Sequence, residues 1–328
     1  MNERRLGRSL VVSALGFGCM ALAGPNAAGP ELATAEALVR RAVERGVCFF
    51  DTADVYGLGA SESLLGRCLA PIRDQVVLAT KAGIRRGPDG AFLGIDGSPA
   101  HLRASCEASL RRLGTGTIDL LILHRVDPAI PVEDSVGEMS RLVAEGKVRF
   151  LGLSEAAPDS IRRAHATHRL AAVESEYSLL TRDPEADTLA CVRALNIGFI
   201  AASPLGRGLL TGTLHRPEDL PEGDARRAQP RFFAENFARN VALVRIVEDM
   251  AHRLRCTPAQ LALAFLLAQG SDVVPIPGPR SEAEFDENLG ALEVPLSAED
   301  LGRLMRAVPP GAAAGARQVP EQMATFGR

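Results

Sequence analysis

The stretch FFDTADVYG (residues 49–57) passes from a buried-looking apolar run into a loop that carries two acids and a tyrosine. A continuously apolar run of this kind is typical of a strand with both faces covered. Tyr56 follows Asp51 by five residues and is one of only two tyrosines in the chain of 328 residues. Polar side chains at such a strand end favour a functional loop rather than a connection alone.

Short apolar runs recur along the chain and alternate with longer amphipathic segments. The eight runs lie at residues 14–19, 47–51, 76–81, 118–124, 148–154, 171–175, 197–203 and 272–278. Ser98-Pro99 and Thr257-Pro258 have the chemistry of helix starts, and Gly46 and Gly114 that of helix ends. Eight strands, each followed by a helix, predict an α/β fold of the closed (β/α)8 or TIM-barrel type.

Residues 1–328 are expected to form one domain, because no linker divides the chain. The segment RRLGRSLVVS (residues 4–13) predicts a short N-terminal β-hairpin at the barrel bottom, and extra helices are expected near the C-terminus. The composition of residues 309–328 suggests a flexible tail. The loops 84–97 and 205–235 are rich in Gly, Pro and Arg, and loops of that length usually contact ligands.

The main alternative is a doubly wound dinucleotide-binding sheet, which requires G-x-G-x-x-G directly after the first strand. GFGCMA (residues 16–21) ends in alanine instead of the third glycine. PLGRGLLTG (residues 204–212) places its third glycine one position late and lies far along the chain. Both matches are too weak to favour that fold.

Composition bears on partners and compartment. The net charge is −3 and no half of the chain is strongly basic, which argues against nucleic acid. No apolar run approaches the roughly 20 residues of a membrane span, and six scattered cysteines favour a reducing compartment. HATH (residues 165–168) offers two histidines without a third ligand, so no metal is expected. We expect a cytoplasmic monomer or small homo-oligomer that binds a small molecule.

Asp51, Lys81 and His124 each end an apolar run, and Tyr56 follows in the loop. In a barrel of this type, all four would meet at the carboxyl ends of the strands, where catalytic groups lie. An ammonium beside a phenol favours the phenolate and lowers the phenol pKa. Asp51 would keep Lys81 protonated, and His124 would donate a hydrogen bond to a carbonyl oxygen. Each residue alone has a structural interpretation, but the set predicts a site that protonates a carbonyl.

Several further blocks occur in a fixed order. They are ATK (79–81), LLILHR (120–125), GLSEA (152–156), SEYSLLTRDPE (175–185), SPLGRGLLTG (203–212) and IPG (276–278). From about residue 4 to about residue 307 the chain resembles the aldo-keto reductase family, in its bacterial and plant branch. The resemblance implies a barrel that reduces aldehydes and ketones with NADPH, NADH being possible. It also implies that Tyr56 donates the proton, with Lys81, Asp51 and His124 as its partners.

The resemblance also implies positions for the cofactor. The implied contacts are Ser154, Glu155 and Glu174 at the carboxamide, Ser203, Pro204, Leu205, Gly206 and Gly208 across the pyrophosphate, and Gly278, Arg280, Glu287 and Asn288 at the adenosine end. Arg280 is the candidate for a 2′-phosphate, by a charge-assisted hydrogen bond, although a solvated loop arginine remains the alternative.

Three positions depart from the common family pattern. Glu155 stands where Asn is frequent, Glu174 where Gln is usual, and Ala202 where an aromatic ring usually stacks on the nicotinamide. A carboxylate at position 174 adds charge near that ring. We therefore expect either a raised pKa for Glu174 or a preference for the oxidised nicotinamide.

The loops would set the choice of substrate. The candidate pocket residues are Phe17, Met20, Leu22, Val55, Ile84 and Phe92, with Arg125 near the rim. A mainly apolar lining suggests a medium-sized aldehyde or ketone rather than a small acid. The alternative function is a regulatory protein of the same fold that holds NADPH as a sensor and turns over slowly.

Overall fold

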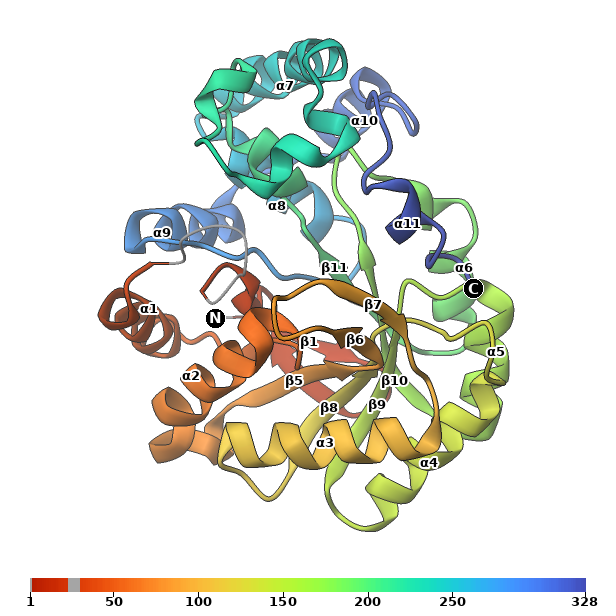
Figure 1. Ribbon diagram of the computed structural model, residues 1–328. Coiled ribbons are helices and arrows are strands. Elements are labelled where there is room, and N and C mark those ends of the chain that lie inside the picture. The colour runs from red at the N-terminus through yellow and green to blue at the C-terminus, as the bar shows by residue number, and fades with distance from the viewer. Residues whose placement is uncertain (1, 23–29) are drawn as a thin grey trace.

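Eight parallel strands form the centre of the computed structural model, which describes residues 2–22 and 30–328. In sheet order they are β3 (Phe17–Gly18), β4 (Phe49–Asp51), β5 (Val77–Ala82), β8 (Ile118–Leu123), β9 (Val148–Ser154), β10 (Leu170–Glu176), β11 (Gly198–Ala202) and β12 (Val273–Pro275). The amides of Gly16 and Gly18 donate to the carbonyls of Pro275 and Pro277 at 2.9 Å, so the two outer strands meet. The predicted (β/α)8 barrel is therefore confirmed (Figure 1).

The barrel closes where two glycines allow the backbones to approach. A Cβ atom at Gly18 would lie only 2.7 Å from the carbonyl oxygen of Ile276. One at Gly278 would lie 2.8 Å from the oxygen of Gly18. Real Cβ contacts are not this short, so these two positions require residues without a side chain.

Helices surround the barrel (Figure 1). They are α1 (Leu32–Glu44), α2 (Ala60–Leu69), α3 (Pro99–Leu113), α4 (Val132–Ala144), α5 (Pro158–Thr167), α6 (Thr188–Ala194), α7 (Ala234–Leu254), α8 (Pro258–Leu267), α9 (Glu282–Leu289), α10 (Ala298–Ala307) and α11 (Pro320–Met323). The predicted extra C-terminal helices correspond to α10 and α11. Helix α7 is a further addition between β11 and α8. Apolar side chains fill a large core between strands and helices and a smaller one inside the barrel.

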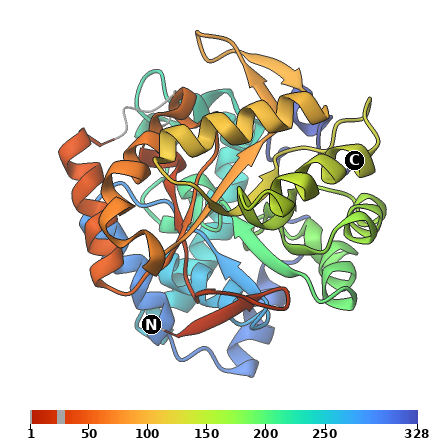
Figure 2. The same cartoon turned by 90° about the horizontal axis from the view of Figure 1, so that it is seen from below.

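An N-terminal hairpin closes the bottom of the barrel, as the sequence predicted (Figure 2). Strands β1 (Glu3–Leu6) and β2 (Leu10–Ser13) pair in antiparallel fashion. Leu6 and Leu10 are buried in the same cluster as inward-facing barrel residues such as Phe49. Arg4 fixes the hairpin from outside, because its guanidinium donates to the carbonyls of Leu267 at 2.7 Å and Gly270 at 2.6 Å.

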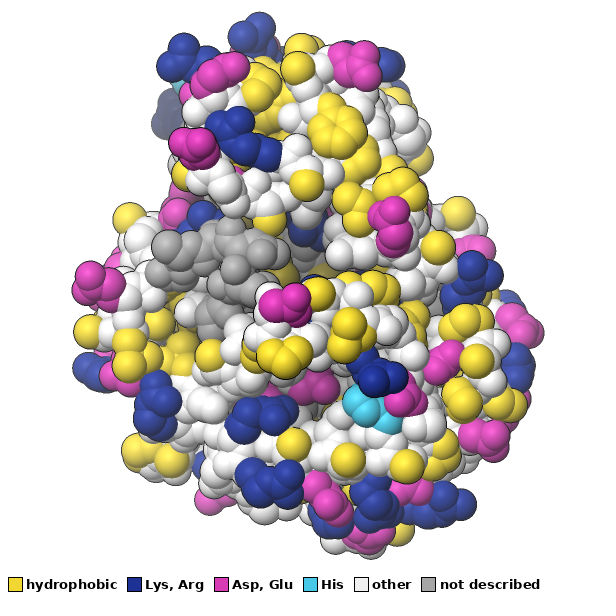
Figure 3. Space-filling view, viewed as in Figure 1, with side chains coloured by type: hydrophobic (Ala, Val, Ile, Leu, Met, Phe, Trp, Pro, Cys, Tyr) yellow, Lys and Arg dark blue, Asp and Glu magenta, His cyan; other side chains and the backbone are white. Residues whose placement is uncertain are grey.

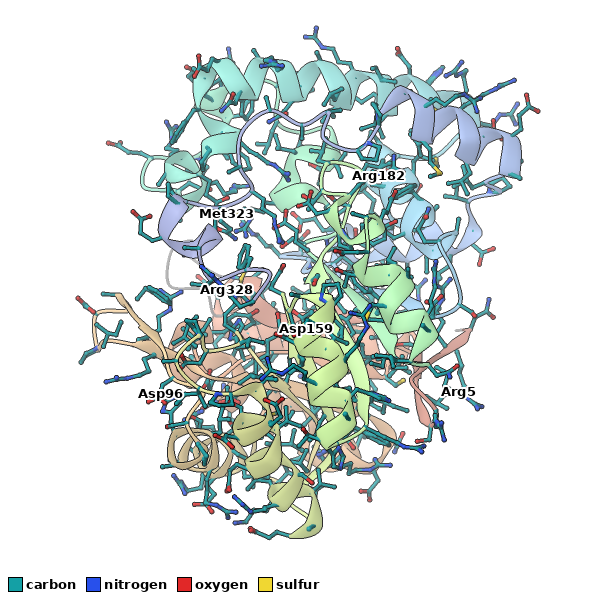
Figure 4. The ribbon with its side chains drawn as sticks, turned by 90° about the vertical axis from the view of Figure 1, so that its right-hand side faces the viewer. Arg5, Asp96, Asp159, Arg182, Met323 and Arg328 are labelled. Atoms are coloured by element: carbon teal, nitrogen blue, oxygen red, sulfur yellow. The ribbon has the colours of Figure 1, made fainter. Side chains whose placement is uncertain are left out.

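Two segments flank the open end of the barrel. The loop after β5 contains the antiparallel strands β6 (Ile84–Arg86) and β7 (Phe92–Ile95). The surface is hollowed between this hairpin and the α7–α8 region (Figure 3). Residues 309–328 follow α10, and Figure 4 shows Met323 and Arg328 in this segment, with Arg328 near Asp159 at the start of α5. The carbonyl of Arg328 accepts from the amide of Ala157 at 3.0 Å.

Among the described residues, no helix is both long enough and apolar enough to cross a membrane.

Truncating the hairpin plug should destabilise the protein. Leu6 is fully buried, so Leu6→Ala removes methyl groups and leaves a cavity at the barrel bottom. We expect a loss of about 2–5 kcal/mol in the free energy of unfolding, measured by urea denaturation. Val11→Ala in the same hairpin is the control, because Val11 is 40% exposed and its truncation should cost less than about 0.5 kcal/mol. Equal losses for the two variants would contradict the plug.

Candidate active site

Lys81 lies at the centre of the barrel mouth with no exposed surface. Its ammonium pairs with the Asp51 carboxylate from β4 and donates to the carbonyl oxygen of Thr52 at 3.0 Å. It also lies 3.3 Å from Oε2 of Glu174 on β10. Burial alone would lower the pKa of Lys81, but the charges of Asp51 and Glu174 outweigh burial and raise it. Lys81, on β5, is therefore a permanent cation that groups from β4 and β10 hold in place.

Tyr56 and His124 lie beside this cation. Tyr56 begins the short 3-10 segment Tyr56–Gly59, and the Lys81 ammonium is 5.4 Å from the centre of its ring. The ring of His124, directly after β8, meets the Tyr56 ring edge-on with centroids 6.3 Å apart. The structure thus brings together the four residues that the sequence singled out. Their assignment as catalytic groups remains a proposal.

Burial has the largest influence on the pKa values of both rings. It raises the pKa of Tyr56 to about 12, although the Lys81 charge acts in the opposite direction. The sequence-based expectation of a lowered Tyr56 pKa is therefore wrong for the protein by itself. Burial, with Arg125 and Lys81, lowers the pKa of His124 well below its usual range. At neutral pH the pair consists of a protonated phenol and a neutral imidazole.

Glu174 belongs to the same buried cluster as Lys81 and Asp51. Its side chain is only 6% exposed. Burial, followed by the nearby Asp51 charge, raises the pKa of Glu174 to about 8. This agrees with the first of the two effects expected from a carboxylate at a position where Gln is usual.

Two arginines bind the residues predicted to contact the nicotinamide carboxamide. Nη1 of Arg125 donates to Oγ of Ser154 at 3.1 Å. Arg317 donates to both carboxylate oxygens of Glu155 at 2.7 Å. Glu155 has a left-handed backbone with φ of 55°, a conformation that Asn tolerates better than Glu. The bidentate pair with Arg317 is a contact that holds Glu155 in this conformation.

The C-terminal segment takes part in this network. The Phe326 ring lies 4.6 Å from the Arg125 guanidinium and 4.4 Å from that of Arg317. The amide of Gly327 donates to the carbonyl of Glu155 at 2.8 Å. Residues 309–328, expected from their composition to form a flexible tail, therefore make specific contacts at the barrel mouth. Sequence analysis missed Arg317 and Phe326, because no local pattern links them to a loop some 160 residues earlier.

The loop after β11, which the sequence predicts to cross the pyrophosphate, has a run of left-handed backbone conformations. Ser203, Gly206 and Gly208 have φ of 47°, 57° and 94°, with Pro204 and Leu205 between them. Nη1 of Arg226 donates to the carbonyl oxygen of Arg207 at 2.9 Å and so fixes this turn. The amides of Gly206 and Gly208 donate within the loop to the carbonyls of Ser203 and Leu205 at 2.9 and 3.0 Å, so hydrogen bonds of its own hold the loop in successive tight turns.

The positions predicted for the adenosine end lie at the two ends of helix α9. Gly278 and Arg280 are exposed in the loop between β12 and α9, directly before the N-terminus of that helix. Glu287 and Asn288 are in the last turn of α9, with Asn288 buried. The N-terminus of α9 is capped by Ser281, and Glu284 in its first turn accepts from the Arg280 amide at 2.7 Å, so the Arg280 side chain rather than the helix end is the candidate for a phosphate. Arg280 is therefore the exposed cation at this end of the mouth that fits a phosphate group.

The predicted substrate residues divide into two groups. Phe17 and Leu22 are in the outer core, where the Phe17 ring packs on Phe50 and Phe285 at 5.8 and 6.0 Å, so they do not line the mouth. The remaining candidates are in the loops that follow the strands: Met20, Val55, Ile84, Phe92 and Arg125. Met20 is 46% and Phe92 36% exposed, so both leave apolar surface in contact with solvent.

A (β/α)8 barrel with this Asp–Tyr–Lys–His cluster defines an oxidoreductase that acts on carbonyl or alcohol groups. Residues 14–308 match the model described as "Aldo/keto reductase family". The chain is 47% identical over 309 residues to "Probable aldo-keto reductase 1" of Glycine max, covering 93% of this chain and 88% of that protein. The chain belongs to the aldo/keto reductase family.

Solved structures agree with this assignment. A glycerol dehydrogenase from Gluconobacter oxydans superposes with a TM-score of 0.85 at 29% identity, covering 94% of this chain and 96% of that one. The holo form of an aldo-keto reductase from Bacillus halodurans gives a TM-score of 0.78 at 29% identity, with 96% and 98% covered.

The raised pKa of Glu174 should make stability depend on pH. An unfolded glutamate titrates near ~4.3, so between that value and about 8 the folded chain binds more protons than the unfolded chain. The free energy of unfolding should therefore fall as the pH rises through this window, by up to about 1.4 kcal/mol per pH unit. Glu174→Gln should lack this component. Urea denaturation of both proteins across this pH window gives the two free energies of unfolding. If the wild-type value minus the Glu174→Gln value rises with pH instead of falling, the assignment is refuted.

Proposed function

We propose that the protein reduces an aldehyde or ketone to the alcohol with NADPH, Tyr56 being the proton donor. The observation that carries the proposal is the position of the Tyr56 ring, 5.4 Å from a fully buried ammonium and edge-on to a neutral histidine at the barrel mouth. The cofactor, when bound, supplies the hydride from C4 of its nicotinamide to the carbonyl carbon.

Each member of the cluster has a distinct role in this reaction. Tyr56 is protonated at neutral pH, so its hydroxyl is available to the carbonyl oxygen. Lys81 carries a positive charge that stabilises the phenolate as the proton leaves, an interaction that is stronger in the transition state than before it. Asp51 holds the Lys81 ammonium in place. His124, with its lowered pKa, is neutral and donates a hydrogen bond that orients the carbonyl.

The cofactor would lie across the mouth from β9 to α9. Ser154, Glu155 and Glu174 face the nicotinamide end, and the turn from Ser203 to Gly208 spans the pyrophosphate. Gly278, Arg280, Glu287 and Asn288 take the adenosine end. The exposed guanidinium of Arg280 favours a 2′-phosphate, hence NADPH over NADH.

The substrate would enter between the β6–β7 hairpin and the C-terminal segment. Met20, Val55, Ile84 and Phe92 supply apolar surface, which suits a medium-sized carbonyl compound. The similar barrel described as a glycerol dehydrogenase supports chemistry between an alcohol and a carbonyl.

A sensor that binds NADPH and turns over slowly is the second candidate. It is favoured by the altered nicotinamide side of the mouth, where Glu174 replaces an amide and Ala202 an aromatic ring. Tight NADPH binding without measurable oxidation by a panel of aldehydes and ketones would support the sensor over the enzyme.

Removing the Tyr56 hydroxyl should abolish most turnover. Tyr56→Phe keeps the ring but has no proton to donate, so kcat should fall about 100-fold or more. Oxidation of NADPH by an aldehyde panel, followed by absorbance, measures it. Tyr177→Phe is the matched control. The Tyr177 ring packs in the outer core and its hydroxyl donates to Glu185 at 2.8 Å, so turnover should persist. Retention of full activity by Tyr56→Phe would exclude the proposed proton donor.

Removing the Arg280 charge should weaken binding of NADPH more than of NADH. A charge-assisted hydrogen bond contributes about 1.5–3 kcal/mol, so Arg280→Ala should raise the Kd for NADPH roughly 10- to 100-fold. NADH lacks the 2′-phosphate, so its Kd should change little. Fluorescence titration measures both constants, with the exposed Arg245→Ala on α7 as control. Equal weakening of the two nucleotides would show that Arg280 does not select the phosphate.

A further inference from the structure

Lys81 is shared by two carboxylates that arrive from opposite sides. Asp51 comes from β4 and Glu174 from β10, while Lys81 itself is on β5. The side chain of Asp51 is 3% exposed, that of Glu174 6% and that of Lys81 0%. The buried cluster therefore contains two acids and one lysine in a space almost without water.

Charge balance requires one proton on this pair of acids. With both carboxylates ionised, the cluster would carry a net charge of −1 in a desolvated site, which is costly. Other groups near Glu174 are Tyr56, which is neutral, and the Arg125 cation, which hydrogen-bonds Ser154 and the carbonyl of His124 and forms no ion pair with Glu174 in the described structure. Asp51 makes the closer contact with Lys81, so Glu174 is the acid that keeps the proton.

Protonated Glu174 lies next to the Lys81 ammonium, which in turn lies near the Tyr56 ring. Oε2 of Glu174 is 3.3 Å from Nζ of Lys81, and Lys81 is in turn 5.4 Å from the centre of the Tyr56 ring. Lys81 thus contacts Glu174 on one side and lies over the Tyr56 ring on the other, which makes its ammonium the group through which a proton would move between them.

We propose that Glu174 is the proton reservoir of the site and supplies, through Lys81, the proton that Tyr56 gives to the carbonyl oxygen. This inference rests on the proposed function. In one turnover the substrate carbon gains a hydride from NADPH and its oxygen gains the Tyr56 proton. The O–H bond of Glu174 then breaks and that of Tyr56 re-forms, with Lys81 protonated before and after. The products are the alcohol, NADP⁺ and the Glu174 carboxylate.

The same transfer keeps the charge of the buried site constant. The reduced nicotinamide is neutral and faces a neutral Glu174, whereas the oxidised ring is positive and faces a carboxylate. Binding of NADP⁺ to the resting protein should therefore expel the Glu174 proton, and binding of NADPH should not. The two nucleotides carry the same 2′-phosphate, so the difference between them reports the nicotinamide side alone.

The experiment counts protons on binding, with no substrate present. Wild type is mixed with saturating NADP⁺ or NADPH in weakly buffered solution at neutral pH, and a pH indicator records the release. We expect NADP⁺ to release about one proton per site more than NADPH. Glu174→Gln should bind both nucleotides and lose this difference. Glu138→Gln, which removes a buried glutamate from α4, is the matched control and should retain it.

A second measurement uses the wild type alone. The excess release by NADP⁺ should vanish at a pH well above the titration of Glu174, because no proton then remains to expel. Bound nucleotides with no difference in proton release at neutral pH would overturn the reservoir, as would persistence of the difference in Glu174→Gln. Failure of wild type to bind either nucleotide would instead refute the proposed function.

Discussion

A single ammonium group, Lys81, sets the electrostatics of the barrel mouth. Because it is fully buried, its charge must be balanced by a protein group, and the Asp51 carboxylate provides that balance, while Glu174 keeps its proton beside the same ammonium. The arrangement is costly for stability alone, since desolvation offsets much of the attraction. The buried ammonium has a chemical use in the proposed reaction, because a permanent cation beside the Tyr56 ring stabilises the phenolate that forms when the proton leaves.

The barrel explains how residues far apart in the sequence reach this ammonium. Parallel strands all deliver their carboxyl ends to the same edge, so β4, β5, β8 and β10 each place one side chain at the mouth. Closure depends on Gly18 and Gly278, where the first and last strands approach too closely for a Cβ atom. The same approach brings the loop before α9, with Arg280, next to the first strand.

Sequence patterns located the residues at strand ends but gave little information on side-chain direction. Asp51, Lys81 and His124 were identifiable because each ends an apolar run. Phe17 was misplaced, because a strand of two residues gives no alternation from which to tell inward from outward, and its ring packs in the outer core. The pKa of Tyr56 was predicted in the wrong direction, since the weight of burial against a neighbouring charge depends on the completed fold.

The departures from the family pattern become coherent once the fold is known. Glu155 occupies a left-handed position where Asn is the easier residue, and the salt bridge from Arg317 gives its carboxylate a partner there. Arg317 also holds Phe326 against Arg125, so this substitution is linked to the seating of the C-terminal segment. Glu174 is likewise stabilised by Lys81 rather than by solvent. The carboxylate of Glu155 is thus matched by Arg317, and Glu174 stays protonated beside the Lys81–Asp51 pair, so neither acid adds a net charge to the mouth before the cofactor enters.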